Sequence, residues 1–259
     1  ALPICDDDAM ERDYHYDSAR AFADLANAEA VGREAARRTL KRLGARSLST
    51  RKAPVILSAE MARGFFGHLT GALSGGSQYR KASFLLDARG QAVFPRWMQI
   101  TEQPLLKRGP GSAAYDDEGV AACTDPLVVD GVIERYVLGS YSARKLGLAT
   151  TGNAGGVHNL TVAANAGSLD ELFADMGTGL YVTELLGQGV SIITGDYSRG
   201  AAGYWIENGR IAYPVHEITI AGNLKDMLAG IVAVGKDVQV RGSKQTGSIL
   251  VDRMTVAGE

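Results

Sequence analysis

The apolar residues near the start of the chain recur at helical spacing. Between Ser18 and Leu43 the sequence is rich in Ala, Arg and Glu, and its apolar positions return every three or four residues. Residues with this spacing share one face of a helix. The pattern therefore predicts a helical segment, which Asn27 could divide into two helices. The positions that define the apolar face are Phe22, Leu25, Ala36, Leu40 and Leu43.

The next stretch predicts a strand followed by a helix. The short apolar run APVILSA at 53–59 indicates a strand, and apolar residues return to helical spacing over 60–73. We expect Gly75 and Gly76 to end that helix as a C-cap pair.

Two dipeptides predict β hairpins in the remainder of the chain. Asp130-Gly131 and Asn208-Gly209 each stand between two β-rich runs, and both pairs tolerate the positive φ angles that a type I′ turn requires. Further strands are expected near 157–162, 180–185, 190–195 and 249–256, and helices near 169–176 and 224–232.

This order of elements predicts an α+β fold with a predominantly antiparallel β-sheet and several helices. Hairpins interrupted by helices are not typical of a doubly wound parallel sheet. We expect residues 46–259 to form one α+β domain and residues 1–45 to be a helical segment that connects to a further N-terminal domain. The missing initiator Met and the abrupt start indicate the later part of a longer chain.

The composition is that of an ordinary globular protein. Of 259 residues, 46% are hydrophobic and 22% are charged, and the net charge is −2. A nearly neutral chain gives no electrostatic basis for binding nucleic acid or an anionic membrane. No apolar run is long enough to span a bilayer, and the start is acidic, unlike a signal peptide. We expect a cytoplasmic protein in which Cys5 and Cys123 are reduced.

Three catalytic motifs are nearly present, and each lacks a residue that its chemistry needs. GIVAVGKD ends in Asp237, where a phosphate loop places the hydroxyl that holds Mg²⁺. Ser198 in GDYSRG lacks the glycine spacing of a nucleophile elbow. HEITIA has Ile220 where a zinc-protease helix needs its second histidine, and its alternation predicts that His216 lies on a strand.

The glycine-dense loop TTGNAGG at 150–156 is a candidate for binding. Its backbone N–H groups could face a ligand, although a tight turn is the favoured interpretation. His158 follows this loop, His15 lies at the expected surface, and His68 lies among apolar residues in RGFFGHLTG. A histidine in apolar surroundings is more often a hydrogen-bonded core residue than a ligand. The histidines and cysteines show no metal-ligand spacing.

Long blocks of this sequence resemble a known family. They are SYSARKLGL (140–148), TTGNAGGVHN (150–159), GTGLYVTELLGQGVSIITGDYSRGAAGYWIENG (177–209) and YPVHEITIAGNLKDM (213–227). Together they closely resemble the PmbA branch, also called TldE, of the TldD/PmbA family. The similarity runs from about Arg12 to the terminal MTVAGE and implies that the family's N-terminal region is missing here.

The resemblance implies a cytoplasmic bacterial protein that pairs with a TldD-like subunit as a zinc metalloprotease for unfolded peptides. It also implies a part in maturing a microcin precursor and in degrading the antidote of a toxin–antitoxin pair. An older description of the family is modulator of DNA gyrase.

The resemblance also indicates where a metal would be expected. TldD carries HExxxH on a helix after a short apolar strand, with a cysteine near the C-terminus as third ligand. The matching positions here are Arg63, Gly64 and His68, with Thr246 near the cysteine position. A catalytic zinc needs about three protein ligands and a nearby base, whereas Arg63 stays protonated and Gly64 has no side chain. We therefore expect no catalytic residue, metal or cofactor in this chain, and zinc on the TldD-like partner.

We expect such a non-catalytic subunit to help hold an extended peptide through main-chain hydrogen bonds at a strand edge. The candidate residues are Thr151, Gly152, Asn153, Gly155, Gly156, Asp196, Tyr197, Ser198 and Arg199. Three alternatives remain open. One is a metallopeptidase in its own right, with ligands such as His158 and His216. Another is an interaction protein that modulates DNA gyrase or a regulator without proteolysis, and the third is a homodimeric scaffold.

Overall fold

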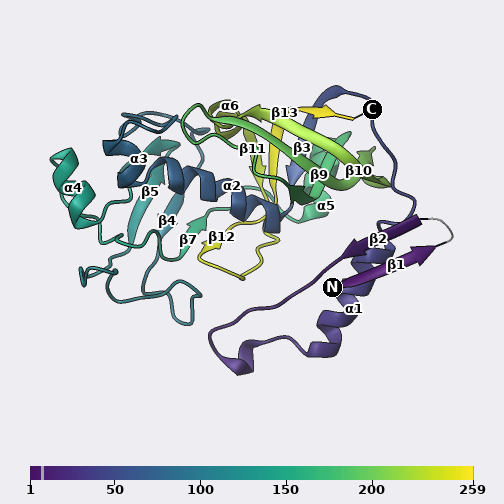
Figure 1. Ribbon diagram of the computed structural model, residues 1–259, viewed down its shortest axis with the longest axis horizontal. Coiled ribbons are helices and arrows are strands. Elements are labelled where there is room, and N and C mark those ends of the chain that lie inside the picture. Colours follow the sequence, from purple (N-terminus) through teal and green to yellow (C-terminus); the bar gives the residue numbers. More distant parts are fainter. Residues whose placement is uncertain (7–8, 259) are drawn as a thin grey trace.

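A computed structural model describes residues 1–6 and 9–258 (Figure 1). In chain order the strands are β1 (Leu2–Asp6), β2 (Ala9–Asp13), β3 (Arg51–Leu57), β4 (Ile100–Glu102), β5 (Asp125–Val129), β6 (Val132–Ile133), β7 (Leu160–Val162), β8 (Gly179–Leu186), β9 (Asp196–Glu207), β10 (Arg210–Asn223), β11 (Ile231–Val234), β12 (Lys244–Gln245) and β13 (Ile249–Ala257). The helices are η1 (Phe22–Asp24, 3₁₀), α1 (Ala28–Leu40), α2 (Ala59–Ala72), α3 (Gly75–Tyr79), α4 (Ser140–Leu146), α5 (Leu169–Met176) and α6 (Leu224–Ala229).

The main sheet is nearly a closed ring of strands. Its order is β10-β9-β8-β3-β13-β11, and β10 also pairs with β13. The first half of β13 pairs with β11, and the second half pairs with β10. All neighbouring pairs are antiparallel except β3 and β8. The predicted antiparallel α+β fold is confirmed.

Helix α2 lies between the main sheet and a second sheet of order β12-β7-β4-β5-β6 (Figure 1). Ser58 caps its start by accepting a hydrogen bond from the Met61 N–H at 3.4 Å. The apolar face of α2, which includes Phe65 and Phe66, shares one core with both sheets. Strand β3 is buried on both faces, since Val55 faces that core and Ile56 belongs to a second cluster under α5.

The N-terminal segment forms an arm beside the rest of the chain (Figure 1). Strands β1 and β2 pair as an antiparallel hairpin and contact α1. The sequence did not predict this hairpin, so residues 1–45 are not purely helical. The helix predicted over 18–43 is confirmed only for Ala28–Leu40, because Asn27 caps its start by accepting from the Glu29 N–H at 2.8 Å. Phe22 is 92% exposed and does not join a buried face.

Other predictions are confirmed where local chemistry decides the conformation. Asp130, Gly131, Asn208 and Gly209 all adopt positive φ, and both hairpin turns form as predicted. The strands expected near 53–59, 180–185 and 249–256 and the helix at 169–176 are also present.

Three predictions are wrong. Gly75 and Gly76 do not end α2: Leu73 is its C-cap, and the two glycines begin α3 with Ser74 as N-cap. Residues 190–195 form turns and make only one bridge, from Val190 to Tyr197, instead of a strand. The helix expected to reach residue 232 ends at Ala229, and the β-branched run after Gly230 forms β11.

No helix within residues 1–6 and 9–258 has the length and apolar character that a membrane crossing requires.

Candidate functional site

The outward side of α2 borders a cavity of about 350 Å³, here named the α2 cavity. The loop that joins β11 to β12 forms its opposite wall. Its lining residues are Glu60, Arg63, Gly64, Gly242, Ser243 and Lys244. Arg63 and Gly64, the positions that the family resemblance matches to the first histidine and the glutamate of the zinc motif, are therefore part of a cavity wall.

Arg63 is held at the rim of this cavity. One terminal nitrogen of its guanidinium donates to the Tyr16 hydroxyl at 3.0 Å, and its Nε is buried without a hydrogen-bond partner. Gly64 is exposed, and a Cβ built there would meet no atom within 4 Å. The two positions thus supply a cation and open space.

His68 faces a different neighbour. Its ring lies edge-on to the Tyr197 ring, with centroids 6.1 Å apart. Burial, together with the charge of Arg199, lowers the pKa of His68 below its ordinary value. We expected core hydrogen bonds to hold this ring, but within the described residues the histidine rings that make hydrogen bonds are those of His15 and His158, and His68 has the Tyr197 ring as its contact. It is half-buried and held by aromatic packing instead.

Thr246 is fully buried, and its hydroxyl donates to the Gly247 carbonyl at 3.0 Å. The segment that contains it does pack on α2, because Lys244 Cε lies 3.9 Å from a Cβ built at Gly67. The side chains at these positions do not suit a zinc ion, since only His68 could ligate one. Within the part of the chain that the structure describes, no group of three or more His, Cys, Asp or Glu residues could hold a metal.

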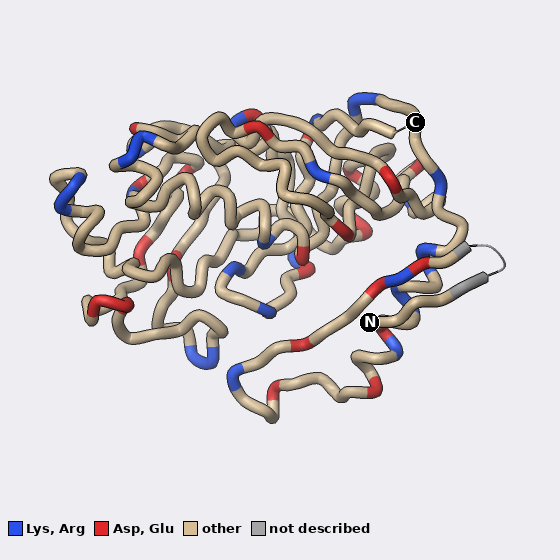
Figure 2. Tube along the Cα trace, viewed as in Figure 1, with Lys and Arg blue, Asp and Glu red and all other residues tan. Residues whose placement is uncertain are grey.

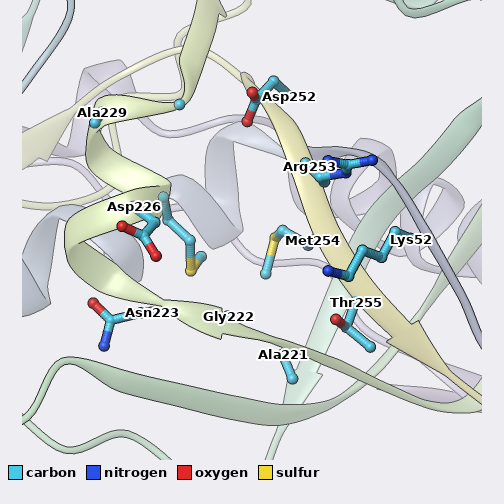
Figure 3. Close-up of a pocket in the computed structure, with 12 residues that line it drawn as sticks. Lys52, Ala221, Gly222, Asn223, Asp226, Ala229, Asp252, Arg253, Met254 and Thr255 are labelled. Carbon is cyan, nitrogen blue, oxygen red and sulfur yellow. The ribbon is translucent and has the colours of Figure 1, made fainter.

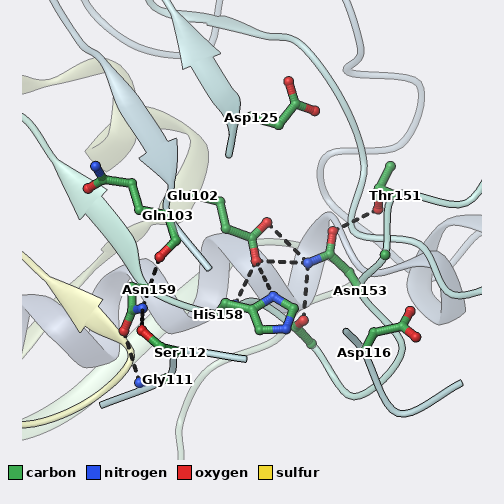
Figure 4. Close-up of polar contacts among 12 residues, drawn as sticks. Glu102, Gln103, Gly111, Ser112, Asp116, Asp125, Thr151, Asn153, His158 and Asn159 are labelled. Carbon is green, nitrogen blue, oxygen red and sulfur yellow. Dashed lines mark hydrogen bonds and ion pairs between the residues drawn. The ribbon is translucent and has the colours of Figure 1, made fainter. Parts of the chain in front are cut away.

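A buried polar network lies at the second sheet, around Glu102 (Figure 4). Glu102 is 2% exposed and ends β4 on the same face as Ile100. Its carboxylate accepts from Arg135 at 2.6 Å, from the Asn153 amide at 2.8 Å and from the His158 backbone N–H at 2.6 Å. His158 Nδ1 lies 2.9 Å from the same carboxylate.

The network keeps Glu102 ionised. Burial opposes the charge, but the His158 N–H and the Arg135 guanidinium outweigh it and hold the pKa of this carboxyl below its usual range. Arg135 also pairs with Asp125 at 2.9 Å. Neither Glu102 nor Arg135 was a sequence candidate. The sequence did contain one indication: Glu102 lies two residues after Ile100, so in a strand its carboxylate shares the buried face of that isoleucine.

The loop 150–156 is anchored by this network. Asn153 is buried and donates to Glu102, and the Ala154 N–H donates to Asp116 at 2.9 Å. The N–H groups of Thr151, Gly152, Asn153 and Gly156 are also bonded inside the protein. The loop is therefore a tight turn with most of its amides engaged, as the favoured interpretation had it.

Gly155 and Gly156 are nevertheless accessible. They line a cavity of about 410 Å³ between the loop and helices α3 and α4, where Tyr79 and Tyr141 lie edge to face with centroids 5.8 Å apart. Among the loop candidates, Asn153, Gly155 and Gly156 therefore line a hollow with aromatic walls, whereas Thr151 and Gly152 do not. Asp196, Tyr197, Ser198 and Arg199 are not part of that lining.

The second candidate stretch, 196–199, is the start of β9. Its backbone is occupied on both sides: β10 pairs with it, and the Ser198 N–H donates to the Gly189 carbonyl at 2.7 Å. Asp196 and Ser198 are exposed, whereas Tyr197 is buried. A peptide could contact the exposed side chains, but it could not add as a strand without displacing residues 189–190.

The two other histidines with candidate roles lie in separate surroundings. His158 belongs to the Glu102 network, and His216 lies on β10 with Nδ1 3.3 Å from Glu11 of the N-terminal hairpin. The predicted strand position of His216 is confirmed.

A further cavity of about 520 Å³ lies beside α6, where β13 passes from β11 to β10 (Figure 3). Asp226 and Asp252 stand on its wall with Lys52 and Arg253, so the charges of the lining balance. None of the sequence candidates lies there.

Comparison with known proteins places these features in a family. The model for the PmbA/TldA metallopeptidase C-terminal domain matches residues 50–258. The chain is 56% identical over 250 residues to metalloprotease PmbA of Escherichia coli O157:H7, covering 96% of this chain and 56% of that protein. It thus spans about half the length of the curated relatives it matches.

A crystal structure from Thermotoga maritima, described as a modulator of a DNA gyrase, superposes with a TM-score of 0.90 at 32% identity, covering 97% of this chain and 60% of that one. A metalloprotease TldD homolog of Haemophilus influenzae is more distant, at 28% identity over 74% of this chain and 42% of that protein. The family match over most of the chain and the high identity to a PmbA protein agree with the resemblance seen in the sequence. The chain therefore belongs to the PmbA/TldD metallopeptidase family, and residues 50–258 are its C-terminal domain.

Proposed function

We propose that this chain belongs to the non-catalytic subunit of a heteromeric zinc metalloprotease that cleaves unfolded peptides in the cytoplasm. A TldD-like subunit supplies the zinc and the catalytic residues. Microcin precursors and antidote peptides are the substrate classes that the family resemblance suggests. The observation that carries the proposal is the side-chain set on α2, where Arg63 and Gly64 stand at the positions of a ligand and a base.

The chemistry of that set argues against hydrolysis at this helix. A guanidinium is a cation at every physiological pH and cannot donate an electron pair to a metal. A glycine cannot accept the proton of a metal-bound water. Glu60, the carboxylate on the cavity wall, pairs with Arg38 at 3.0 Å and is 8% exposed. Neither a ligand set nor a free base is available at the α2 cavity.

The retained fold supports a role in holding substrate. The candidates Gly155 and Gly156 line the hollow beside α3 and α4, and Asp196 and Ser198 are exposed at the start of β9. The Glu102 network fixes the first of these regions, so it can meet a peptide without first becoming ordered.

Measuring zinc and cleavage in three preparations tests the proposal. The whole protein that contains this chain, its TldD-like partner and their mixture are assayed for bound metal and for hydrolysis of an unfolded peptide. We expect zinc in the partner alone and full cleavage in the mixture. About one zinc per subunit, together with cleavage by the protein in isolation, would refute the proposal.

A pair of bulky substitutions tests the binding stretch. Ser198→Tyr places a ring at the start of β9, and Glu207→Tyr places the same ring at the exposed end of that strand. We expect the first variant to raise the KM of the mixture and the second to leave it unchanged. If both variants match the parent protein, residues 196–199 do not line the substrate path.

A further inference from the structure

Unsatisfied buried polar atoms gather around the loop before β12. Six buried side-chain nitrogen or oxygen atoms of the described residues have no hydrogen-bond partner. One of them, Arg135 Nε, still pairs with the Asp125 carboxylate. The other five belong to His15, Arg63, Gln239, Arg241 and Gln245.

These five atoms belong to one neighbourhood. Gln239, Arg241 and Gln245 lie within seven residues of each other in the sequence, and Arg241 contacts His15 at 3.1 Å. A terminal nitrogen of Arg63 lies 3.8 Å from a Cβ built at Gly242. Buried polar groups normally find a partner in the protein or in a bound molecule. Arg63 lines the α2 cavity, and Arg241 and Gln245 flank its lining residues 242–244 in the sequence, so the unsatisfied groups border this cavity and leave room for a further partner.

The α2 cavity is basic. Arg63 and Lys244 line it, and Figure 2 marks basic residues along the loop that precedes β12. Within the described residues, no carboxylate lies within 4.0 Å of the side-chain nitrogens of Arg63 or Lys244. Arg241 is 3.9 Å from Asp17, and Glu60 is paired with Arg38. Burial lowers the pKa of Lys244, because no acidic neighbour offsets the loss of water around its ammonium group.

We infer that the α2 cavity binds a carboxylate of the substrate peptide, with Arg63 and Lys244 as its cationic partners. The inference rests on the proposed function and names the chemical group that the site would recognise. A guanidinium matches the two oxygens of a carboxylate in a planar, bidentate arrangement, and an ammonium adds a point charge. The open space at Gly64 admits the group, and the second terminal nitrogen of Arg63 makes no hydrogen bond within the described residues.

A chain terminus is the source of carboxylate that the site fits best. An unfolded peptide carries one terminal carboxylate whatever its sequence, so a subunit that reads this group can hold many substrates in one direction. An acidic side chain carries the same carboxylate group, and a comparison of peptides distinguishes binding of a side-chain carboxylate from binding of the terminal one.

Binding of three labelled peptides to the whole protein tests the inference. The first is a flexible ten-residue peptide with a free C-terminal carboxylate, the second has the same sequence with a C-terminal amide, and the third is the amide with one glutamate near its end. Fluorescence anisotropy gives each Kd. We expect the free acid to bind about tenfold more tightly than the amide, as is usual for a hydrogen-bonded charge. Recovery of tight binding by the third peptide would assign the site to carboxylates in general.

Two double variants locate the effect. Arg63→Gln with Lys244→Gln should reduce the affinity for the free acid to that for the amide. Lys107→Gln with Lys225→Gln removes the same charge from exposed positions outside the α2 cavity and should keep the tenfold ratio. If the double variant of Arg63 and Lys244 perturbs folding, the single variant Lys244→Gln replaces it in the binding measurement. Thermal unfolding of Lys244→Gln and of the parent protein shows whether the single variant is folded.

Equal binding of all three peptides, or no binding of any, overturns the inference. So does a ratio that survives in Arg63→Gln with Lys244→Gln. These outcomes leave the proposed subunit role standing, since that role fails only if the isolated protein holds zinc and cleaves peptide by itself.

Discussion

Removing the charge of Glu102 is the sharpest test of how the loop 150–156 is held. In Glu102→Gln the side chain keeps its shape but replaces one acceptor oxygen with a donating amide. The carboxylate accepts hydrogen bonds from Arg135, Asn153 and the backbone of His158. The single amide oxygen of glutamine cannot accept hydrogen bonds from all of these donors, and its NH₂ group, itself a donor, faces another donor. The variant therefore leaves buried donors unpaired.

The structure sets the size of the effect. Breaking a buried charge pair by removing one partner costs about 3–5 kcal/mol. In the variant, Arg135 keeps its contact with Asp125 at 2.9 Å, so part of the Arg135 charge stays compensated. The compensation is partial because the Asp125 side chain is half-exposed. We expect the lower end, about 3 kcal/mol, which lowers the midpoint of thermal unfolding by about 10 °C for a chain of this size.

The pH dependence provides an independent check. The pKa of Glu102 is lowered in the folded state, so its contribution to stability is present above the pKa of the unfolded chain and is lost as the pH falls through the folded value. The stability difference between the parent protein and Glu102→Gln should therefore shrink below about pH 4.

Chemical denaturation at pH 7 and at pH 3.5 measures both effects, with Glu207→Gln as the matched control. Glu207 is exposed at the end of β9, so its variant should stay within about 0.5 kcal/mol of the parent protein. If Glu102→Gln is as stable as that control at pH 7, the charge of Glu102 does not hold the loop.

Three further predictions concern single positions. The NMR titration midpoint of His68 should lie below about 6.5, because burial and the charge of Arg199 both lower its pKa. Arg199→Gln should raise this midpoint, and an unchanged midpoint would contradict the effect of Arg199. Gly75→Ala should cost about 1–3 kcal/mol in chemical denaturation, since the new methyl group would overlap a side chain of α4. Gly32→Ala, in open space on α1, should instead stabilise by about 0.5–1 kcal/mol, and equal effects of the two would refute the packing argument. Asp130→Ala should lower the free energy of unfolding by about 1 kcal/mol in the same measurement, because residue 130 has a φ of +49°. Asp130→Asn should leave stability unchanged. An alanine variant as stable as the parent protein would show that the turn has relaxed.

The sequence predicted best those features that depend on neighbouring residues. The turns at Asp130-Gly131 and Asn208-Gly209 follow from the backbone angles that these residues tolerate. Periodicity over 18–43 was misleading, because the same spacing places Phe22 on a surface that this chain leaves uncovered. Strand β11 was missed because its four residues directly follow α6 and show no alternation of their own.

The candidate site depends on contacts that no local pattern contains. Glu102 and Arg135 meet because β4 pairs with β5, and β5 turns back into β6. Asn153 and His158 join them from a loop that lies about fifty residues further along the chain than Glu102. The density of glycines identified this loop as a candidate from the sequence. The contact of the loop with Glu102 could not be predicted, because it depends on how the strands of the second sheet pair.

The pairing of β13 has a consequence for synthesis of the protein on the ribosome. Strand β13 supplies the partner for β3, β11 and β10, and it is made after all three of them. Until it emerges, β3 lacks one of its two neighbours, and a strand that is buried on both faces presents an unpaired apolar edge. Exposed edges of this kind invite pairing with other chains. During the interval before β13 is released, the open edge of β3 is therefore the place where the nascent protein is exposed to such mispairing.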